Sequence, residues 1–390
     1  MRSILSSLAV LTVSLCLTSV GRSQTCSNTR EYVDPVYGTK ITELVSPGRN
    51  DHNLYYHRNP WNADNTYLVG VDSDADSRNW SVILYDGRGC FIRRLFTIEQ
   101  YDWRLVWDRR DPNTLYTWQG SNLYRFDVPS NRAQLLKSFA PLRLQPNGPS
   151  LNQAGDRILV GTSDNVFRSY HLPDMGEERS FSARFPDGCR SSWKDERYIG
   201  FRNYIATACN ATNPPNMALH IYNDSGETFH VFEGTGGGGH YDFSPDGKLA
   251  YFNMWSGGRG RPSTPLEIHL VGIDGTSDRV LYSASQEVAK SVQNLHLSWP
   301  DRVTTWFVAG FFPFSGAQQD KYSPPFDEVA AIDLSGNFRA LARAETHPGR
   351  GVAFWAQTLA SPSADGSRIS FNSNRTGSIE QYILWTPTKP

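Results

Sequence analysis

The sequence of 390 residues predicts an all-β fold built from seven copies of one small unit. Its composition is the first indication, because 32 Gly and 23 Pro supply turns while 18 Tyr and 11 Trp favour strands. The second is a pattern that recurs along the chain: a short strand, a polar turn and a β-forming run of four or five residues. Four strands per unit, repeated seven times, is typical of propeller blades. We therefore predict a seven-bladed β-propeller with four antiparallel strands per blade.

The first two strands of each unit form a predicted hairpin. Its seven turns are marked by Asp64, Asp111, Asp156, Asp195, Asp246, Asp301 and Asp365. The clearest copy is Ser244-Pro-Asp-Gly before the run 248–252. Proline presets φ and glycine tolerates positive φ, so this turn between two β-forming runs indicates a tight reversal of the chain.

A third and a fourth strand complete the unit. Residues 268–275 and 329–336 are examples of the third strand, and residues 279–282 and 339–342 of the fourth. The last unit is one strand short, and residues 37–45 at the front of the chain can supply its outer strand. Such closure of the ring removes an exposed sheet edge. A six-bladed ring and a pair of β-sandwiches are the alternatives.

The N-terminus predicts export. Residues 1–23 have the pattern of a secretory signal, with Arg2 in the charged region, an apolar core and a small-residue cleavage site. We expect residues 24–390 to form one propeller domain that is secreted or periplasmic; a lipoprotein anchor at Cys16 is the alternative. The formal net charge of −1 offers no electrostatic footprint for nucleic acid or an anionic membrane, and we expect a monomer.

Four cysteines remain once the predicted signal is removed. They are Cys26, Cys90, Cys189 and Cys209. No pair has the CxxC spacing of a zinc ribbon or a redox motif, and an exported protein permits disulfides. Of the three pairings we favour Cys189–Cys209 with Cys26–Cys90, because the first closes a local loop. Four buried free thiols are the alternative.

The first residues of the seven innermost strands are expected to line the top of the central channel. These positions hold His52, His57, Arg58, Trp103, Arg104, Ser150, Arg190, His240, His296 and Gln357. An ordinary scaffold would carry apolar or small residues here. Arginine binds carboxylates through a bidentate fork, and Trp61 or Trp103 could stack on a sugar ring. The partner that this ring predicts is an acidic oligosaccharide or polysaccharide.

Three segments carry a resemblance to a known family. They are Asp51-His-Asn-Leu-Tyr-Tyr-His-Arg-Asn-Pro-Trp-Asn-Ala-Asp-Asn, His240-Tyr-Asp-Phe-Ser-Pro-Asp-Gly and Leu295-His-Leu-Ser-Trp-Pro-Asp. In these segments the chain resembles the oligogalacturonate lyase family and, more loosely, TolB-type propeller repeats. The resemblance spans most of the chain in blade order, although its motifs are short. It implies cleavage of uronate-containing oligosaccharides by β-elimination with a divalent metal, usually manganese.

The resemblance also implies a metal site, held by one histidine of the sixth blade and by a glutamine and two histidines of the seventh. His296 matches the sixth-blade ligand, and Gln357 matches the glutamine. The expected cofactor is therefore a divalent metal, Mn or Ca. Ala360 and Pro362 stand where the two further histidines of the family would be.

The catalytic residues follow from the chemistry of β-elimination. The substrate carboxylate must be neutralised, a base must take the C5 proton, and an acid must help the C4 oxygen to leave. The basic arginine of the family would fall near Ala218 and is not matched, whereas histidine can act as base or acid near neutrality. We predict His240, which matches a fifth-blade histidine of the family, His52 and His296 as catalytic residues. The predicted substrate-binding residues are His57, Arg58, Trp103, Arg104 and Arg190.

Two functions remain open at this point. The first is an exported lyase-like enzyme that cleaves uronate-containing glycans. The second is a non-catalytic TolB-like propeller that binds a glycan or a protein partner, and Ala360 and Pro362 favour it. The fold alone does not separate the two, because one fold supports many functions.

Overall fold

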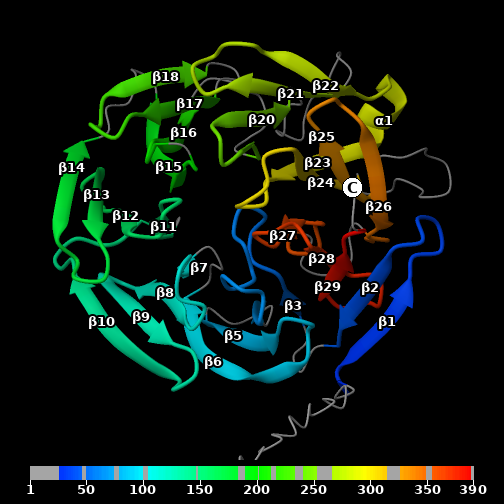
Figure 1. Cartoon of the computed structure of the whole chain (residues 1–390), viewed down its shortest axis with the longest axis horizontal. Helices are drawn as coiled ribbons and strands as arrows, with labels where there is room; N and C mark the ends of the chain where they lie inside the picture. Colours follow the sequence, from blue (N-terminus) through cyan, green and yellow to red (C-terminus); the bar gives the residue numbers. More distant parts are fainter. Residues whose placement is uncertain are drawn as a thin grey trace, which may run out of the picture.

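Seven antiparallel sheets surround one central axis in the computed structural model (Figure 1). The structure describes residues 26–45, 50–73, 79–99, 104–145, 148–182, 189–200, 202–211, 217–232, 240–252, 266–313, 326–347 and 354–387. Six sheets have four strands and one has five, so the predicted seven-bladed β-propeller is confirmed. The predicted secretory signal lies outside the described residues. No helix within these ranges is long and apolar enough to cross a membrane.

In blades one to six the strands follow in chain order from the axis to the rim. Blade one has β3 (Asp51–His52), β4 (Tyr67–Asp72), β5 (Asn79–Asp86) and β6 (Phe91–Glu99). Blade two has β7 (Leu105–Trp107), β8 (Thr114–Gln119), β9 (Asn122–Asp127) and β10 (Arg132–Ser138). Blade three has β11 (Ser150–Leu151), β12 (Arg157–Gly161), β13 (Val166–His171) and β14 (Glu177–Ser182).

The remaining blades repeat this order. Blade four has β15 (Cys189–Tyr198), β16 (Ile205–Ala211), β17 (Met217–Tyr222) and β18 (Thr228–Phe232). Blade five has β19 (Asp242–Phe243), β20 (Lys248–Phe252), β21 (Glu267–Gly272) and β22 (Arg279–Ser283). The short helix α1 (Gln286–Ser291) precedes blade six, which has β23 (Val292–Ser298), β24 (Trp306–Pro313), β25 (Glu328–Asp333) and β26 (Phe338–Arg343). Blade seven has β27 (Ser361–Pro362), β28 (Arg368–Ser373) and β29 (Glu380–Trp385), followed by β2 (Lys40–Leu44) and β1 (Thr29–Val33).

The hairpin between β19 and β20 forms where the sequence predicts it. Gly247 has a φ of 83°, a conformation that glycine adopts without steric cost. Its N–H donates to the carbonyl of Ser244 at 3.1 Å, and the Ser244 hydroxyl donates to Asp246 at 2.6 Å. The turn residues therefore satisfy one another, and the two β-forming runs pair on either side.

The chain closes its ring as predicted, with one addition. Strand β2 pairs with β29, with Ile41 opposite Leu384, and so supplies the fourth strand of blade seven. Strand β1 adds a fifth strand beyond it, which the sequence analysis did not anticipate. The Cys26–Cys90 disulfide then ties the chain before β1 to the turn between β5 and β6 of blade one. This predicted pairing is confirmed, whereas the side chains of Cys189 and Cys209 lie outside the described part of the chain.

The hydrophobic core is divided among the spaces between neighbouring blades. Six of the seven described clusters join side chains of two adjacent blades, and the seventh joins blades one and two with residues beside blade seven. In one example, Leu159 and Phe167 of blade three pack with Tyr198 and Ile205 of blade four. Burial of apolar surface between sheets stabilises the ring by roughly 25 cal/mol per Å². Each blade therefore depends on both of its neighbours.

Residues 53–60, which we call the axial segment, leave the strand geometry and enter the centre of the ring (Figure 1). The Tyr56 hydroxyl donates to the Tyr241 carbonyl of blade five at 3.3 Å, and the Ser298 hydroxyl of blade six donates to the Tyr56 carbonyl at 2.7 Å. The Arg58 guanidinium donates to the Pro149 carbonyl, beside blade three, at 2.7 Å. The axial segment thus connects blades on opposite sides of the ring and occupies the channel.

Candidate functional site

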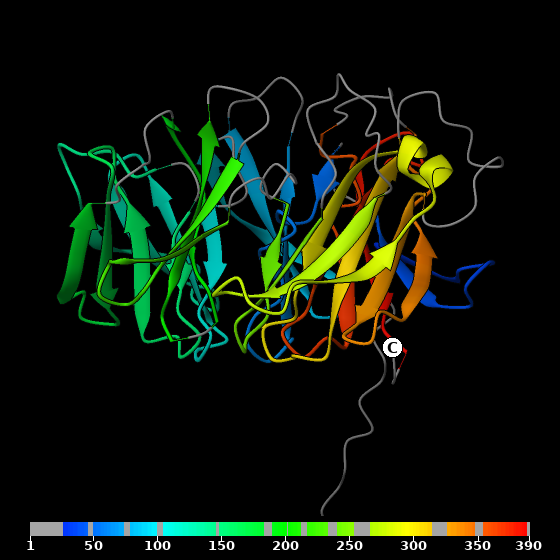
Figure 2. The ribbon, with the colours of Figure 1, turned by 90° about the horizontal axis from the view of Figure 1, so that it is seen from above.

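The central channel has two chemically different ends. Each innermost strand is the first of its blade and crosses the disc in the same sense, so its first residues meet at one face and its first turn at the other (Figure 2). We call these the start face and the turn face. The residues around His240 and Gln357 precede innermost strands and belong to the start face, whereas the turns after Trp107 and Ser298 belong to the turn face.

Four polar side chains form a cluster at the start face, which we call the histidine cluster: His240, Asn294, His296 and Gln357. His240 comes just before β19, Asn294 and His296 lie on β23, and Gln357 comes before β27. The Nδ1 atom of His240 lies 2.7 Å from the Oδ1 atom of Asn294, whose Nδ2 atom donates to Gln357 at 3.1 Å. A single hydrogen-bonded chain therefore links blades five, six and seven.

The hydrogen bonds of Asn294 assign the tautomer of His240. The Leu295 backbone N–H donates to the Asn294 Oδ1 atom at 2.9 Å, and a backbone N–H can only donate, so this atom is the acceptor oxygen. The Nδ1 atom of His240 must then carry the proton that it shares with Asn294. In the neutral ring the lone pair is left on Nε2, which makes His240 a base of defined orientation.

His296 lies directly beside His240 and is fully buried. The two ring centroids are 4.2 Å apart with an interplanar angle of 36°. Burial and the neighbouring His240 hold the pKa of His296 well below its usual value, so the ring is neutral. Neither of its ring nitrogens has a hydrogen-bond partner among the described residues.

Of the metal ligands that the resemblance implies, only His296 and Gln357 are present here. The partnerless nitrogens of His296 would suit a metal, but Gln357 already accepts a hydrogen bond from Asn294. Ala360 and Pro362 offer no side-chain ligand, and the described residues contain no group of three His, Cys, Asp or Glu that could hold a metal ion. The donor set present therefore does not fit the four-ligand site of the family.

Aromatic side chains border the histidine cluster. Phe354 is 40% exposed, which is unusual for so large an apolar ring, and it stacks on Tyr55 with centroids 6.2 Å apart and an interplanar angle of 14°. Tyr55 in turn contacts His296 edge-on at 5.9 Å. An exposed aromatic face beside a base is suited to the apolar face of a sugar ring.

His52, a predicted catalytic residue, lies in a different environment. It is fully buried, stacked on Trp355 at 4.2 Å and contacted edge-on by Trp80 at 5.3 Å. Its Nδ1 atom donates to the Asn53 carbonyl at 2.8 Å. Burial lowers the pKa of His52 to about 4. These contacts join blade seven to blade one, and we do not include His52 in the proposed site.

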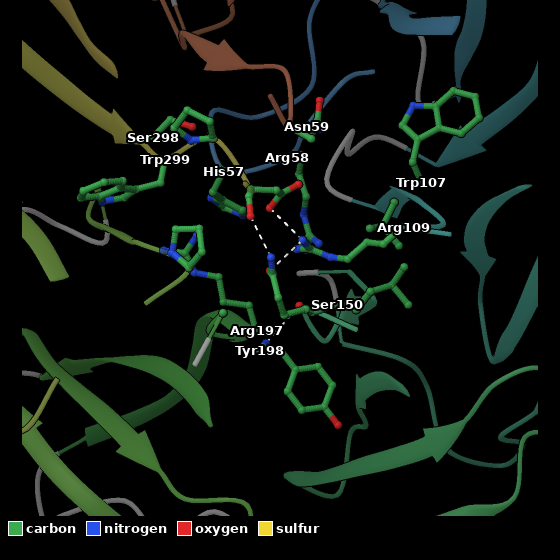
Figure 3. Close-up of a pocket in the computed structure, with 18 of the residues that line it drawn as sticks. His57, Arg58, Asn59, Trp107, Arg109, Ser150, Arg197, Tyr198, Ser298 and Trp299 are labelled. Carbon is green, nitrogen blue, oxygen red and sulfur yellow. Dashed lines mark hydrogen bonds and ion pairs between the residues drawn. The ribbon is translucent and has the colours of Figure 1, made fainter. Parts of the chain in front are cut away.

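His57 and Arg58, predicted to bind substrate beside His240, line a cavity of about 190 Å³ that opens towards the turn face (Figure 3). The His57 ring lies 4.9 Å from the rings of Tyr55 and Tyr56. Burial, and the charges of Arg197 and Arg58, hold the pKa of His57 well below its usual value. The axial segment therefore places these two residues on the side of the channel away from the start face.

The other predicted sugar-binding residues are placed as follows. The Arg104 guanidinium lies 5.9 Å from the Trp118 ring centroid, beside the start of blade two. Trp103 and the side chain of Arg190 lie outside the described part of the chain. Trp61 is fully buried and donates its indole N–H to the Gly87 carbonyl at 3.3 Å, so it presents no face to a sugar.

Sequence reasoning missed Asn294, Phe354 and the buried ion pair between Arg197 and Asp242. Asn294 could have been found, because residues two apart on a strand point to the same face and His296 was already selected. Arg197 and Asp242 are 2.8 Å apart and belong to different blades, which no local pattern reveals. Phe354 stands before β27 in a segment without a strand pattern.

The fold and the histidine cluster define a seven-bladed β-propeller with a polar site on its axis. No family model and no curated protein matches the sequence. Among solved structures, the chain is similar to an oligogalacturonate lyase in complex with manganese (15% identity, 92% of this chain and 96% of that chain, TM-score 0.66). It is also similar to an oligogalacturonate lyase from Vibrio parahaemolyticus, with 12% identity over 93% of this chain and 97% of that chain and a TM-score of 0.66. A β-propeller domain from Myceliophteria thermophila, Cps50, matches with 11% identity over 89% of this chain and all of that one (TM-score 0.54). At these identities the likeness is one of fold.

Proposed function

We propose that this chain is an exported carbohydrate-active enzyme, a lyase that cleaves uronate-containing glycans by β-elimination at the start face. The observation that carries the proposal is the pairing of His240 with Asn294, which leaves the lone pair of the neutral ring on Nε2. The similarity to two oligogalacturonate lyases supports it at the level of architecture. The disulfide supports an oxidising compartment, which is where exported proteins reside.

In the proposed reaction the Nε2 atom of His240 takes the proton from C5 of the uronate. The electron pair of that C–H bond forms the C4–C5 double bond, the bond between C4 and the glycosidic oxygen breaks, and water protonates the leaving oxygen. His296 is a positioning residue, because its buried neutral ring packs against His240. Phe354 and Tyr55 would support the sugar ring, and Arg104 remains the predicted partner of the carboxylate.

The divalent metal that the resemblance implies does not fit the donor set of His296 and Gln357, so it is not part of this proposal and no step of the reaction is routed through it. When bound in the manner of the family, such a metal would supply neutralisation of the substrate carboxylate. Metal analysis of the purified protein tests this conclusion, with His296→Ala as the control. A stoichiometric divalent ion that is lost in this variant would contradict our conclusion that the donor set does not fit.

The decisive experiment is an ultraviolet assay for unsaturated uronate with oligogalacturonate, ulvan-type and glucuronate-containing glycans. We expect turnover on at least one of them and a loss of about 10²–10⁴-fold in His240→Gln, as for removal of a general base. His171→Gln is the matched control, because His171 is an exposed histidine on the third strand of blade three. Absence of unsaturated product on all three classes of glycan would refute the enzyme.

A non-catalytic propeller that binds a glycan or a protein is the second candidate. Ala360 and Pro362 favour it, since they remove side chains that the lyase family uses for its metal. A β-propeller domain of another kind shares the fold. Glycan binding that persists in His240→Gln, without turnover of any glycan by the unmodified protein, would support this candidate over the lyase.

A further inference from the structure

The cavity at the turn face is a second site on the same axis, separated from the histidine cluster by the axial segment. It has a volume of about 190 Å³ and is lined by residues of several blades (Figure 3). One water needs about 10–15 Å³ measured in this way, so the cavity has room for a small organic molecule. None of its lining residues belongs to the histidine cluster.

Two buried guanidinium groups face this cavity. Arg58 is 6% exposed and Arg197 is 7% exposed, whereas arginine is almost never buried to this extent unless it is paired. Arg58 donates to the Pro149 carbonyl, and Arg197 pairs with Asp242 at 2.8 Å. Both therefore hold defined orientations before any ligand arrives, which lowers the entropic cost of binding an anion.

The wall offers a further hydrogen-bond donor. Trp299 lines the cavity and is 6% exposed, and its indole N–H has no acceptor among the described residues. An indole N–H can only donate, and a buried donor without an acceptor costs about 1–3 kcal/mol. A ligand with acceptor oxygens would remove this cost.

The carboxylates of the lining are already engaged with the protein. Asp242 accepts from Arg197 and, at 2.6 Å, from the Trp299 backbone N–H. Asp108 accepts from the Tyr116 hydroxyl at 2.8 Å, and Asp301 pairs with Arg109 at 3.0 Å. The lining holds four arginines, Arg58, Arg109, Arg197 and Arg302, against three aspartates, Asp108, Asp242 and Asp301. The charge of the cavity is therefore positive by one.

An ion pair at the edge of the cavity connects blades two and six. Arg109 of the turn after β7 reaches Asp301 of the turn after β23, and Gln153 donates to the Asp301 carbonyl at 2.8 Å. The Arg109 and Asp301 side chains are 26% and 31% exposed, so this bridge meets solvent. A small molecule can reach the cavity past these partly exposed side chains.

We propose that this cavity binds a small oxyanion, a carboxylate or a phosphate, through Arg58, Arg197 and the indole N–H of Trp299. Guanidinium groups bind both anions through paired N–H···O hydrogen bonds. The proposal does not depend on the lyase function, because it uses none of the residues of the histidine cluster.

Calorimetric titration of the purified protein with acetate, malonate and inorganic phosphate tests the proposal. We expect saturable binding of at least one anion, weakened about tenfold in Arg58→Gln and about threefold in Trp299→Phe, as for loss of a charged and a neutral hydrogen bond. Arg88→Gln is the matched control, because Arg88 is 56% exposed, pairs with Asp86 in the turn between β5 and β6, and does not line the cavity. The three anions distinguish a carboxylate from a phosphate site.

Trp299→Phe keeps an aromatic ring and removes the N–H donor, so it remains informative if Arg58→Gln does not fold. A crystal soaked with 3-bromobenzoate provides a second readout, since the bromine signal locates the anion and an aryl bromide does not alkylate histidine or cysteine. The proposal is refuted if none of the three anions binds saturably, or if binding is as strong in Trp299→Phe as in Arg88→Gln. Bromine density at the surface alone would count equally against it.

Discussion

The Nδ1 atom of His240 donates a hydrogen bond to the Oδ1 atom of Asn294 over 2.7 Å, across the boundary between blades five and six. Asn294 is held in place from two further sides, by the Leu295 N–H and by Gln357. The ring of His240 therefore has one orientation and one neutral tautomer. Such a fixed base is the arrangement that proton abstraction requires.

Replacement of this amide by a carboxylate should change the titration of His240. In Asn294→Asp the negative charge beside Nδ1 stabilises the imidazolium, so we expect the pKa of His240 to rise by about one unit or more. The acid limb of the kcat/KM profile should move up by the same amount. Nitrogen NMR of the labelled histidines provides a readout that does not need turnover.

The control for this change is Asn131→Asp, at an exposed turn between β9 and β10. It adds the same charge far from the histidine cluster. An unchanged titration of His240 in Asn294→Asp would contradict the hydrogen bond on which the proposed base depends.

The buried ring of His52 should make the protein sensitive to acid. Its pKa is lowered to about 4 from the usual 6.5, so the unfolded chain binds a proton in this interval that the folded chain does not. The neutral ring therefore contributes about 3 kcal/mol to the free energy of unfolding above pH 6.5, and this contribution is lost as the pH falls towards 4. We expect His52→Phe to flatten this pH dependence in urea unfolding, and His171→Phe to leave it unchanged. Parallel pH profiles of His52→Phe and the unmodified protein would show that His52 is not the group responsible.

The Cys26–Cys90 bridge should contribute substantially to stability. Its cysteines are 64 residues apart, and the entropy removed from the unfolded chain by a loop of this size corresponds to about 4 kcal/mol. We expect the double variant Cys26→Ala, Cys90→Ala to unfold at a lower urea concentration than the unmodified protein. Reductant should lower the urea midpoint of the unmodified protein and leave that of the double variant unchanged. If reductant shifts both proteins equally, another thiol is responsible.

A neutral side chain at Glu43 should stabilise the closure of the ring. Burial and the nearby Glu380 raise the pKa of Glu43 to about 6 from the usual 4.5, so the folded protein holds this proton more tightly than the unfolded chain. The protonated side chain therefore contributes its full stability below pH 4.5, and that contribution is lost as the pH rises through 6. We expect the free energy of unfolding of Glu43→Gln to exceed that of the unmodified protein by about 1–2 kcal/mol at pH 8 and to equal it at pH 4. The partner Arg30 is 67% exposed, so its loss costs little.

Glu31→Gln is the matched control, because Glu31 is an exposed carboxylate on the adjacent strand β1. It should leave stability unchanged at both pH values. A Glu43→Gln protein that is less stable at pH 8 would mean that the ion pair with Arg30 outweighs the burial of the charge.

Much of the architecture could be predicted because its determinants are local. The turn Ser244-Pro-Asp-Gly and the runs around it specify a hairpin through φ preferences and side-chain alternation within a few residues. The closing strand was predictable by elimination, since the last blade lacked one strand. Strand β1 was not, because nothing in five exposed or half-buried residues requires a place beyond β2.

The site was only partly predictable. His240, His296 and Gln357 were selected because each stands near the start of an innermost strand, and the structure brings all three together. His52 and Arg58 satisfied the same criterion, yet one is buried between tryptophans and the other faces the turn-face cavity. A position along the chain does not say how far a strand continues before it leaves the sheet.

The sequence by itself determined the number of blades, their strand order and the ring of polar residues near the axis, because these depend on short-range turn chemistry and repetition. The tertiary structure alone decided how that ring is divided. The axial segment turns inward after His52 and separates the histidine cluster from the cavity of Arg58 and Arg197. Its course is set by hydrogen bonds from blades three, five and six, whose partners are far away in sequence and meet only when the ring closes.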